Sequence, residues 1–269
     1  MASQSPLIAV EVHVTHEPHF CWTSAACTHV GMVREINEDS CLDLPQQGIW
    51  AVADGMGVHA CGAVASRMVV EALRALTPGA SLPETITQVR QTLDSVNRQL
   101  LMEAVARNVH IIGSTVVVLI ACGAHCAYLW AGDSRLYRLR DRQLQQLTRD
   151  HSQIEELKAR ADYLPDEVIA QSSRNLITRA VGAMDELETE HETIAVQDGD
   201  MFLLCSDGLS NEVSDDQMKN VLLAGNCKQA AQTLVELALQ NGARDNVTVV
   251  VVHAEDTHSA EKTLLNPAI

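Results

Sequence analysis

The stretch Ile49-Trp-Ala-Val-Ala-Asp-Gly-Met-Gly57 is an apolar run that ends in Asp54-Gly55. The same pattern recurs in Tyr128-Leu-Trp-Ala-Gly-Asp133-Ser134 and in Met201-Phe-Leu-Leu-Cys-Ser-Asp207-Gly208. A further apolar run begins directly after Arg244-Asp245-Asn246, and Asn37-Glu38-Asp39 precedes a short strand in the same way. In an antiparallel sheet the end of one strand lies beside the start of its neighbour, so these acids are predicted to share one edge.

Short runs rich in β-branched residues and separated by tight turns occur along the rest of the chain, which is typical of antiparallel hairpins. The predicted strands are Trp22–Cys27, Ile49–Ala53, Thr115–Ala121, Ala127–Trp130, Leu136–Leu139, Gln143–Leu147, Thr193–Val196, Met201–Cys205 and Val247–His253. Apolar residues recur with helical spacing in Ala60–Leu76, Leu82–Arg107 and Cys227–Leu239. Antiparallel strands with long helices between them predict an α+β layered sandwich.

The length of 269 residues suits one large domain or two small ones. Because no Pro- or Ser-rich linker and no internal repeat divides the chain, we expect one folded domain over 21–254. It is expected to be preceded by an N-terminal arm over 1–20 and followed by a C-terminal tail over 255–269.

The charge balance is acidic, with 19 Lys and Arg against 35 Asp and Glu, a net −16. This charge argues against nucleic acid or an anionic membrane surface as a partner. The first residues lack the basic segment of a signal peptide, and no apolar run approaches the length of a membrane span. The eight cysteines are typical of reduced thiols in a long chain, so a cytoplasmic location is expected.

Carboxylates gathered at one edge of so acidic a chain repel one another unless cations lie between them or some stay protonated. Sites made only of oxygen ligands suit hard ions such as Mg²⁺ or Mn²⁺. The alternative is that Asp and Gly simply form turns after strands, which explains any one motif but not the whole set beside an arginine.

Arg34 lies four residues before Glu38, where its planar guanidinium would hold a phosphate through two hydrogen bonds. Hard metals, bridging carboxylates and a phosphate-binding arginine indicate phosphoester hydrolysis, in which two metals share a water, lower its pKa and direct it at phosphorus. The sequence has no G-x-x-x-x-G-K motif, so ATP use is not indicated.

The motifs resemble the metal-dependent (PPM, type 2C) serine/threonine protein phosphatases in their bacterial single-domain form. The matching stretches, in the order of that family and within residues 22–253, are Gly31–Asp39, Val52–Gly57, Gly113–Thr115, Ala131–Arg135, Leu147–Ser152, Leu204–Leu209 and Asp245–Thr248. The resemblance implies a β-sandwich of two antiparallel sheets flanked by pairs of antiparallel helices, with residues 21–254 as the catalytic domain.

The resemblance also implies roles for the acids around the first motif. Asp54 is similar to the carboxylate that bridges two metals, and the Gly55 carbonyl to a ligand of one of them. Glu38 stands where the family has an acid near the second metal, bound directly or through water. Asp39 is expected beside these ligands rather than on a metal.

Further roles fall on the later motifs. Asp207 and Asp245 match the carboxylates that complete the first metal site, and Asn246 is expected beside them. Asp133 matches the ligand of a third, weaker metal, with Asp207 shared. Arg34 matches the phosphate-binding arginine, which completes a catalytic set with Asp54, Asp207 and Asp245.

The chain departs from the family pattern after Asp-Gly-Met-Gly, where Val58 and His59 follow. A left-handed backbone at Val58 would be strained, because that residue is β-branched. Ala63 stands where the family commonly has an acid, and Met56 where some relatives have a histidine that protonates the leaving oxygen. His59 is the nearest candidate for that acid, or else it only contacts substrate or solvent. Residues 152–175 fall where the family carries a flap over the substrate.

We therefore expect Mn²⁺- or Mg²⁺-dependent hydrolysis of phosphoserine and phosphothreonine on proteins, opposing a serine/threonine kinase. The expected partners are phosphorylated proteins and a cognate kinase. Two alternatives remain open: a catalytically weak module of the same fold that binds phosphoproteins, and a phosphohydrolase that acts on small molecules.

Overall fold

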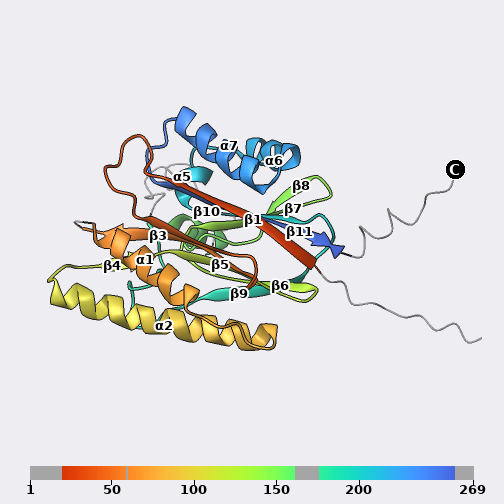
Figure 1. The fold of residues 1–269 in the computed structure, drawn as a ribbon. Coiled ribbons are helices and arrows are strands. Elements are labelled where there is room, and N and C mark those ends of the chain that lie inside the picture. Colours follow the sequence, from red (N-terminus) through yellow and green to blue (C-terminus); the bar gives the residue numbers. More distant parts are fainter. Residues whose placement is uncertain (1–19, 59, 161–175, 258–269) are drawn as a thin grey trace, which may run out of the picture.

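The computed structural model describes residues 20–58, 60–160 and 176–257, and this part of the chain forms two antiparallel sheets packed face to face (Figure 1). The first sheet has the order β1 (Phe20–His29), β11 (Val247–Asp256), β10 (Met201–Cys205), β7 (Arg135–Arg140) and β8 (Gln143–Gln146). The second has the order β2 (Asp39–Leu44), β3 (Ile49–Gly57), β5 (Val116–Cys122), β6 (His125–Ala131) and β9 (Glu190–Ala195). The short β4 (Ile112–Ser114) pairs with the end of β3.

A buried apolar layer fills the space between the two sheets, and the alternation of side chains along each strand builds it. Trp50 and Val52 of β3 point into this layer, as do Val250 and Val252 of β11. The residues between them belong to clusters on the outer faces of the sheets. Both faces of the central strands are therefore covered, which explains why these strands are continuous apolar runs.

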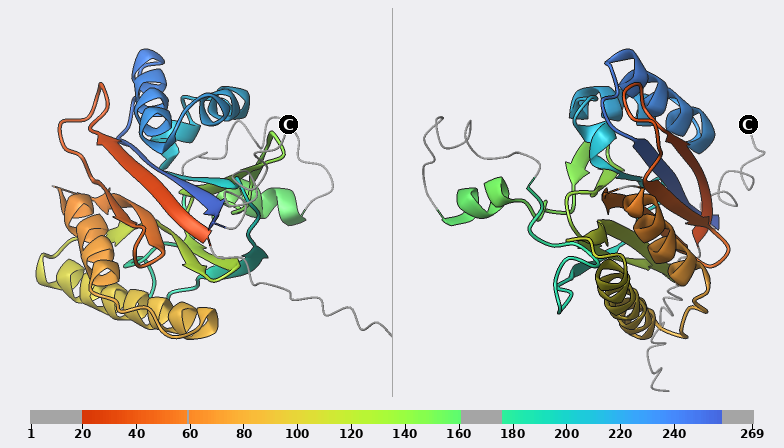
Figure 2. Two further views of the ribbon diagram at one scale, coloured as in Figure 1. Left: turned by 45° about the vertical axis from the view of Figure 1, so that its right-hand side comes forward. Right: turned by 90° about the vertical axis from the view of Figure 1, so that its left-hand side faces the viewer.

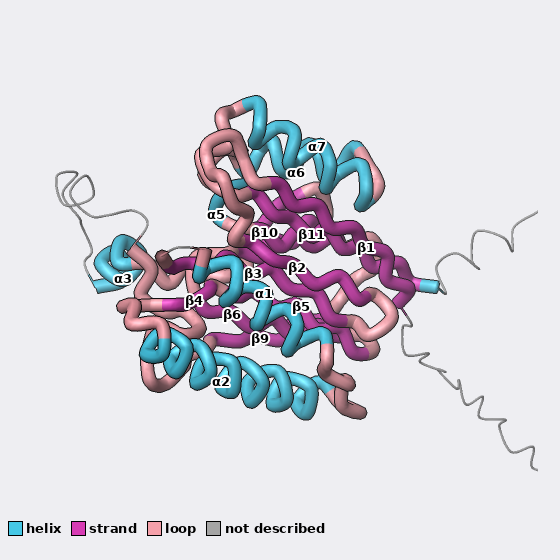
Figure 3. The backbone as a smooth tube through the Cα atoms, turned by 60° about the vertical axis from the view of Figure 1, so that its left-hand side comes forward, coloured by secondary structure: helices cyan, strands magenta, loops and turns pink. Residues whose placement is uncertain are grey.

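Helices cover the outer face of each sheet (Figures 2 and 3). The helices α1 (Cys61–Arg74) and α2 (Leu82–Ala106) pack on the second sheet. The helices α6 (Asp215–Ala224) and α7 (Cys227–Gln240) pack on the first. Polar caps begin three of these helices: Ser81 for α2, Ser214 with Gln217 as a capping box for α6, and Asn226 for α7.

The expected α+β sandwich is confirmed, and the predicted strands and long helices match elements of the structure. The spacing of apolar residues did not predict α6, because only Met218 and Leu222 of this helix are buried. The segment expected as a flap begins with the helix α3 (Gln153–Arg160). Residues 161–175, His59, most of the predicted N-terminal arm and residues 258–269 of the predicted tail lie outside the described residues.

Candidate metal and phosphate site

The predicted strand-end acids meet at one edge of the sandwich, where the two sheets come together. Asp39 and Asp54 lie opposite each other in the β2–β3 ladder. Asp207 begins the short helix α5 (Asp207–Ser210) just after β10, and Asp245 precedes β11. The Ser206 hydroxyl donates a hydrogen bond of 2.7 Å to Asp39 Oδ2 and thereby joins one sheet to the other.

Desolvation and mutual repulsion raise the pKa values of these acids. Burial, followed by the charges of Asp39, Asp207, Asp133 and Asp245, raises the pKa of Asp54 well above its usual value. Burial is the main cause that raises the pKa of Asp39 to about 7 and the pKa of Asp133 to about 7. It also raises the pKa of Asp207, together with the charge of Asp245. The edge therefore favours protons or cations among its carboxylates.

Several buried carboxylate oxygens at this edge have no hydrogen-bond partner within the described residues. They are Glu38 Oε1, Asp39 Oδ1, Asp133 Oδ1 and Asp207 Oδ1. Unpaired buried oxygens are costly, and hard divalent cations bind such oxygens. The residues therefore fit the Mg²⁺ or Mn²⁺ that the motifs imply. In the described arrangement no three acids, histidines or cysteines lie around one point closely enough to hold a metal ion together.

Asp245 differs from these acids because its carboxylate forms an ion pair with Arg34. Arg34 Nη2 donates to Asp245 Oδ2 at 2.7 Å, and both side chains are partly open to solvent. The predicted phosphate-binding arginine therefore stands at the mouth of the acidic edge, directly beside one predicted metal ligand. An exposed guanidinium in this position is accessible to a phosphate on a large substrate.

Asn246 holds the loop that carries Arg34 and Glu38. Its Oδ1 accepts from the Glu38 backbone N–H at 2.7 Å, and its Nδ2 donates to the carbonyls of Val30 at 2.8 Å and Ile36 at 3.0 Å. Asn246 thus fixes the backbone around the site, beside the acids, where the sequence motifs place it.

Gly55 lies where the chain leaves no room for a side chain. A Cβ at this position would come within 2.0 Å of the Gly62 carbonyl oxygen at the start of α1. The Gly55 N–H donates to the Glu38 carbonyl at 3.1 Å, so β3, α1 and the Glu38 segment meet here. The strain expected at Val58 is not found, because within the described loop Gly57 and Ala60 take the positive φ angles.

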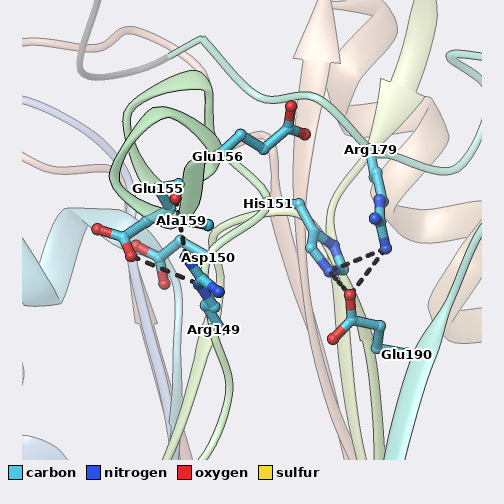
Figure 4. A pocket seen from close by; sticks show the side chains of 8 residues that line it. All are labelled: Arg149, Asp150, His151, Glu155, Glu156, Ala159, Arg179 and Glu190. Carbon is cyan, nitrogen blue, oxygen red and sulfur yellow. Dashed lines mark hydrogen bonds and ion pairs between the residues drawn. The ribbon is translucent and has the colours of Figure 1, made fainter. Parts of the chain in front are cut away.

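A cleft of about 420 Å³ extends from Asp133 and Asp207 toward α3, whose Ile154 and Lys158 line its far side. Next to it, a smaller pocket contains His151, Arg179 and Glu190 (Figure 4). The sequence motifs predicted no role for these three residues, although His151 belongs to one of the matching stretches. The only signal for His151 in the sequence is its place in that stretch, because its contacts are made with distant segments of the chain.

Comparisons with known proteins agree with this architecture. The family model described as protein phosphatase 2C matches residues 29–247, so the chain belongs to that family. The serine/threonine protein phosphatase PstP of Mycobacterium tuberculosis (strain CDC 1551 / Oshkosh) is 37% identical over 236 residues, which are 86% of this chain. This chain spans only 45% of that relative's length.

Solved structures show the same fold. One is described as PppA, a key regulatory component of T6SS in Pseudomonas aeruginosa, with a TM-score of 0.81 and 42% identity over 88% of this chain and 100% of that one. Another is the catalytic domain of PstP in complex with two manganese ions, with a TM-score of 0.79 and 34% identity over 88% of this chain and 100% of that one. Both the fold class and the family resemblance are confirmed.

No helix within residues 20–58, 60–160 and 176–257 combines the length and the apolar character that crossing a membrane requires.

Proposed function

We propose that this chain hydrolyses phosphoserine and phosphothreonine on proteins with the help of bound Mn²⁺ or Mg²⁺. The observation that carries the proposal is the edge of buried, unpartnered carboxylate oxygens beside an accessible arginine. The match to the protein phosphatase 2C family supports the reaction, and the neighbour with two manganese ions supports the metals.

Five residues would hold the two tightly bound cations: Glu38, Asp54, the Gly55 carbonyl, Asp207 and Asp245. The cations supply Lewis acidity and lower the pKa of water when they are bound.

Asp133 would hold a third, more weakly bound cation, and Asp207 would be a ligand both of this cation and of the tightly bound pair. Asp39 stays beside the ligands through its hydrogen bond from Ser206.

Arg34 would bind and orient the substrate phosphate. Its guanidinium is half exposed and is already oriented toward the acidic edge by Asp245. A fork of N–H donors fits phosphate oxygens with two parallel hydrogen bonds, which fixes the direction in which the phosphorus faces. The carboxylates of the acidic edge repel phosphate, so Arg34 would hold a phosphate only when cations bound among these carboxylates balance the charge.

The experiment that tests this function is phosphate release from a phosphothreonine peptide with Mn²⁺, then with EDTA. We expect release with Mn²⁺ and its loss with EDTA. Hydrolysis that continues unchanged in EDTA would contradict the role of the metals. Peptide binding without release would favour the phosphoprotein-binding module, and a higher kcat/KM for small phosphate esters than for any phosphopeptide would favour the small-molecule hydrolase.

The proposed reaction implies a partner enzyme and a location. Because serine/threonine kinases produce phosphoserine and phosphothreonine on proteins, the chain would oppose such a kinase. A cytoplasmic location stays a prediction from the sequence, as does the division into arm, catalytic domain and tail.

A further inference from the structure

His151 contacts the backbone of Gly132 at two points. Its ring Nδ1 accepts a hydrogen bond from the Gly132 N–H at 3.2 Å, and its own backbone N–H donates to the Gly132 carbonyl at 2.9 Å. Gly132 immediately precedes Asp133. Both polar groups of the residue before a proposed metal ligand are therefore bound by one histidine from a segment 19 residues away.

The turn at Gly132 is tightly restricted on its other side as well. Gly132 has φ +113°, and a Cβ there would lie 2.7 Å from Thr115 Cβ. Thr115 Oγ1 shares a 2.7 Å hydrogen bond with the Ser134 hydroxyl and also accepts from the Asp54 N–H at 3.0 Å. The turn that carries Asp133 is therefore held by Thr115 on one side and by His151 on the other.

The imidazole is itself held in place. It is 6% exposed and stacks on Trp130 with ring centroids 5.8 Å apart and an angle of 12° between the planes. Its Nε2 lies 3.2 Å from Glu190 Oε1, which also accepts from Arg179 Nη1 at 2.9 Å (Figure 4).

Because Nδ1 accepts the Gly132 N–H, a neutral ring carries its proton on Nε2. Nε2 lies 3.2 Å from Glu190 Oε1 and 3.4 Å from Arg179 Nη1, so Glu190 is the acceptor on this side. Burial, followed by the charge of Arg179, lowers the pKa of His151, which agrees with a neutral ring.

We propose that His151 is a positioning residue for Asp133: it fixes the Gly132 turn so that the Asp133 carboxylate faces the acidic edge. The inference rests on the proposed function, in which Asp133 holds a weakly bound cation. Asp133 Oδ1 is buried and has no hydrogen-bond partner within the described residues, so the direction of this oxygen follows from the turn that carries it. A turn that can rotate would move that oxygen away from the cation and weaken binding there.

Two substitutions distinguish the effect of the hydrogen-bond acceptor Nδ1 from the effect of the stacked ring. His151→Asn keeps an amide oxygen near the place of Nδ1, whereas His151→Phe keeps a ring that stacks on Trp130 and removes the acceptor. We expect Gly132 amide hydrogen exchange to become about tenfold faster in His151→Phe and to change less than about twofold in His151→Asn. The amide of Leu203 in β10 is the control for global stability, and its exchange should stay unchanged.

The Mn²⁺ dependence of phosphopeptide hydrolysis gives the functional readout. His151→Phe should raise the half-saturating Mn²⁺ concentration about fivefold and lower kcat, while KM for the peptide stays within about twofold. His151→Asn should keep the half-saturating Mn²⁺ concentration and the kcat of the unaltered protein. If the Phe variant does not fold, His151→Gln replaces it, because its longer amide reaches toward Glu190 and not toward Gly132.

Two results would overturn the inference. Unchanged exchange at Gly132 in His151→Phe would show that the ring does not hold the turn. Faster exchange with an unchanged Mn²⁺ dependence would show that the turn does not position Asp133. Absence of phosphatase activity in the unaltered protein would instead contradict the proposed function, and the exchange measurement would still decide whether His151 holds Gly132.

Discussion

The two ends of strand β10 carry aspartates with opposite surroundings, Asp200 buried and Asp207 half-buried. Asp200 precedes the strand, and its carboxylate accepts from Arg140 Nε at 2.7 Å, from Arg140 Nη2 at 2.5 Å and from the Gln197 N–H at 2.9 Å. Asp207 follows the strand, and it has the Asn211 amide at 3.1 Å on one oxygen and no partner on the other among the described residues.

The difference separates a carboxylate whose charge is balanced within the protein from one whose charge is not. At the Asp200 end an arginine balances the buried charge and every oxygen is bonded, so nothing further is needed there. At the Asp207 end like charges gather and oxygens stay free, a cost in stability that a bound cation would offset. The same strand therefore has one end that contributes to stability and another that is suited to binding metal.

The largest effect is expected for Asp207→Asn. Removing one carboxylate charge should weaken cation binding and lower the Mn²⁺-dependent rate by about a hundredfold or more. The metal-free protein should be no less stable than before, because a repelling charge is gone. Phosphopeptide kinetics and thermal unfolding in EDTA measure the two effects. Near-normal turnover in this variant would remove Asp207 from the proposed metal site.

Asp200→Asn should show the reverse behaviour. The substitution leaves the Arg140 guanidinium without its charged partner, and a broken buried pair typically costs about 3 kcal/mol of unfolding free energy. Mn²⁺ dependence should stay normal, because the change lies at the opposite end of β10. Urea unfolding with a parallel Mn²⁺ titration checks this. A stability loss equal to that of Asp207→Asn would erase the distinction between the two ends.

The clustering of the acids was predictable from the sequence because it depends on local features. Apolar runs define the strands, and antiparallel pairing brings the end of each strand next to the start of its neighbour. The site-residue assignments beyond that clustering stay predictions.

Other features were not predictable because they depend on contacts between distant segments. The pairing of Arg34 with Asp245 requires the loop that Asn246 holds, and the clamp of His151 on Gly132 requires the approach of two separate turns. No periodicity or local propensity encodes such contacts.

Arg34→Ala should mainly weaken substrate binding. The guanidinium would hold the phosphate before and during its transfer, so its loss is expected to raise KM about tenfold, or about 1.4 kcal/mol. Arg34→Lys is the matched variant, since it keeps the charge and loses the fork of donors, and it should recover only part of the affinity. Unchanged kinetics on a phosphopeptide would make Arg34 a surface residue without a role in phosphate binding.

Asp133→Ala should lower turnover several-fold while the fold and the tightly bound metals remain. Asp133 is proposed to hold a third cation with fewer carboxylates than the other sites have, so that cation should bind only at about millimolar concentration. Rates measured against Mn²⁺ concentration, together with calorimetric titration of the tight sites, test this. Curves that saturate together at one maximal rate would make Asp133 a turn residue.

The smallest expected effect is the pH dependence of stability in the metal-free protein. The pKa values of Asp39 and Asp133 are raised to about 7, so the folded chain binds more protons than the unfolded chain between roughly pH 4 and 7. Stability should therefore fall as the pH rises through this window, and the thermal midpoint in EDTA should be a few degrees lower at about pH 7.5 than at about pH 5.5.

Mn²⁺ should reverse this trend, since cations bind the deprotonated carboxylates. Asp39→Asn is the control, because it removes one of the two groups whose pKa is raised to about 7 and should flatten the dependence in EDTA. Asp200→Asn should leave the slope of the pH dependence unchanged, although it lowers stability throughout. A midpoint in EDTA that rises between these pH values would mean that the Asp207 end of β10 carries no destabilising charge, and the contrast between its two ends would fail.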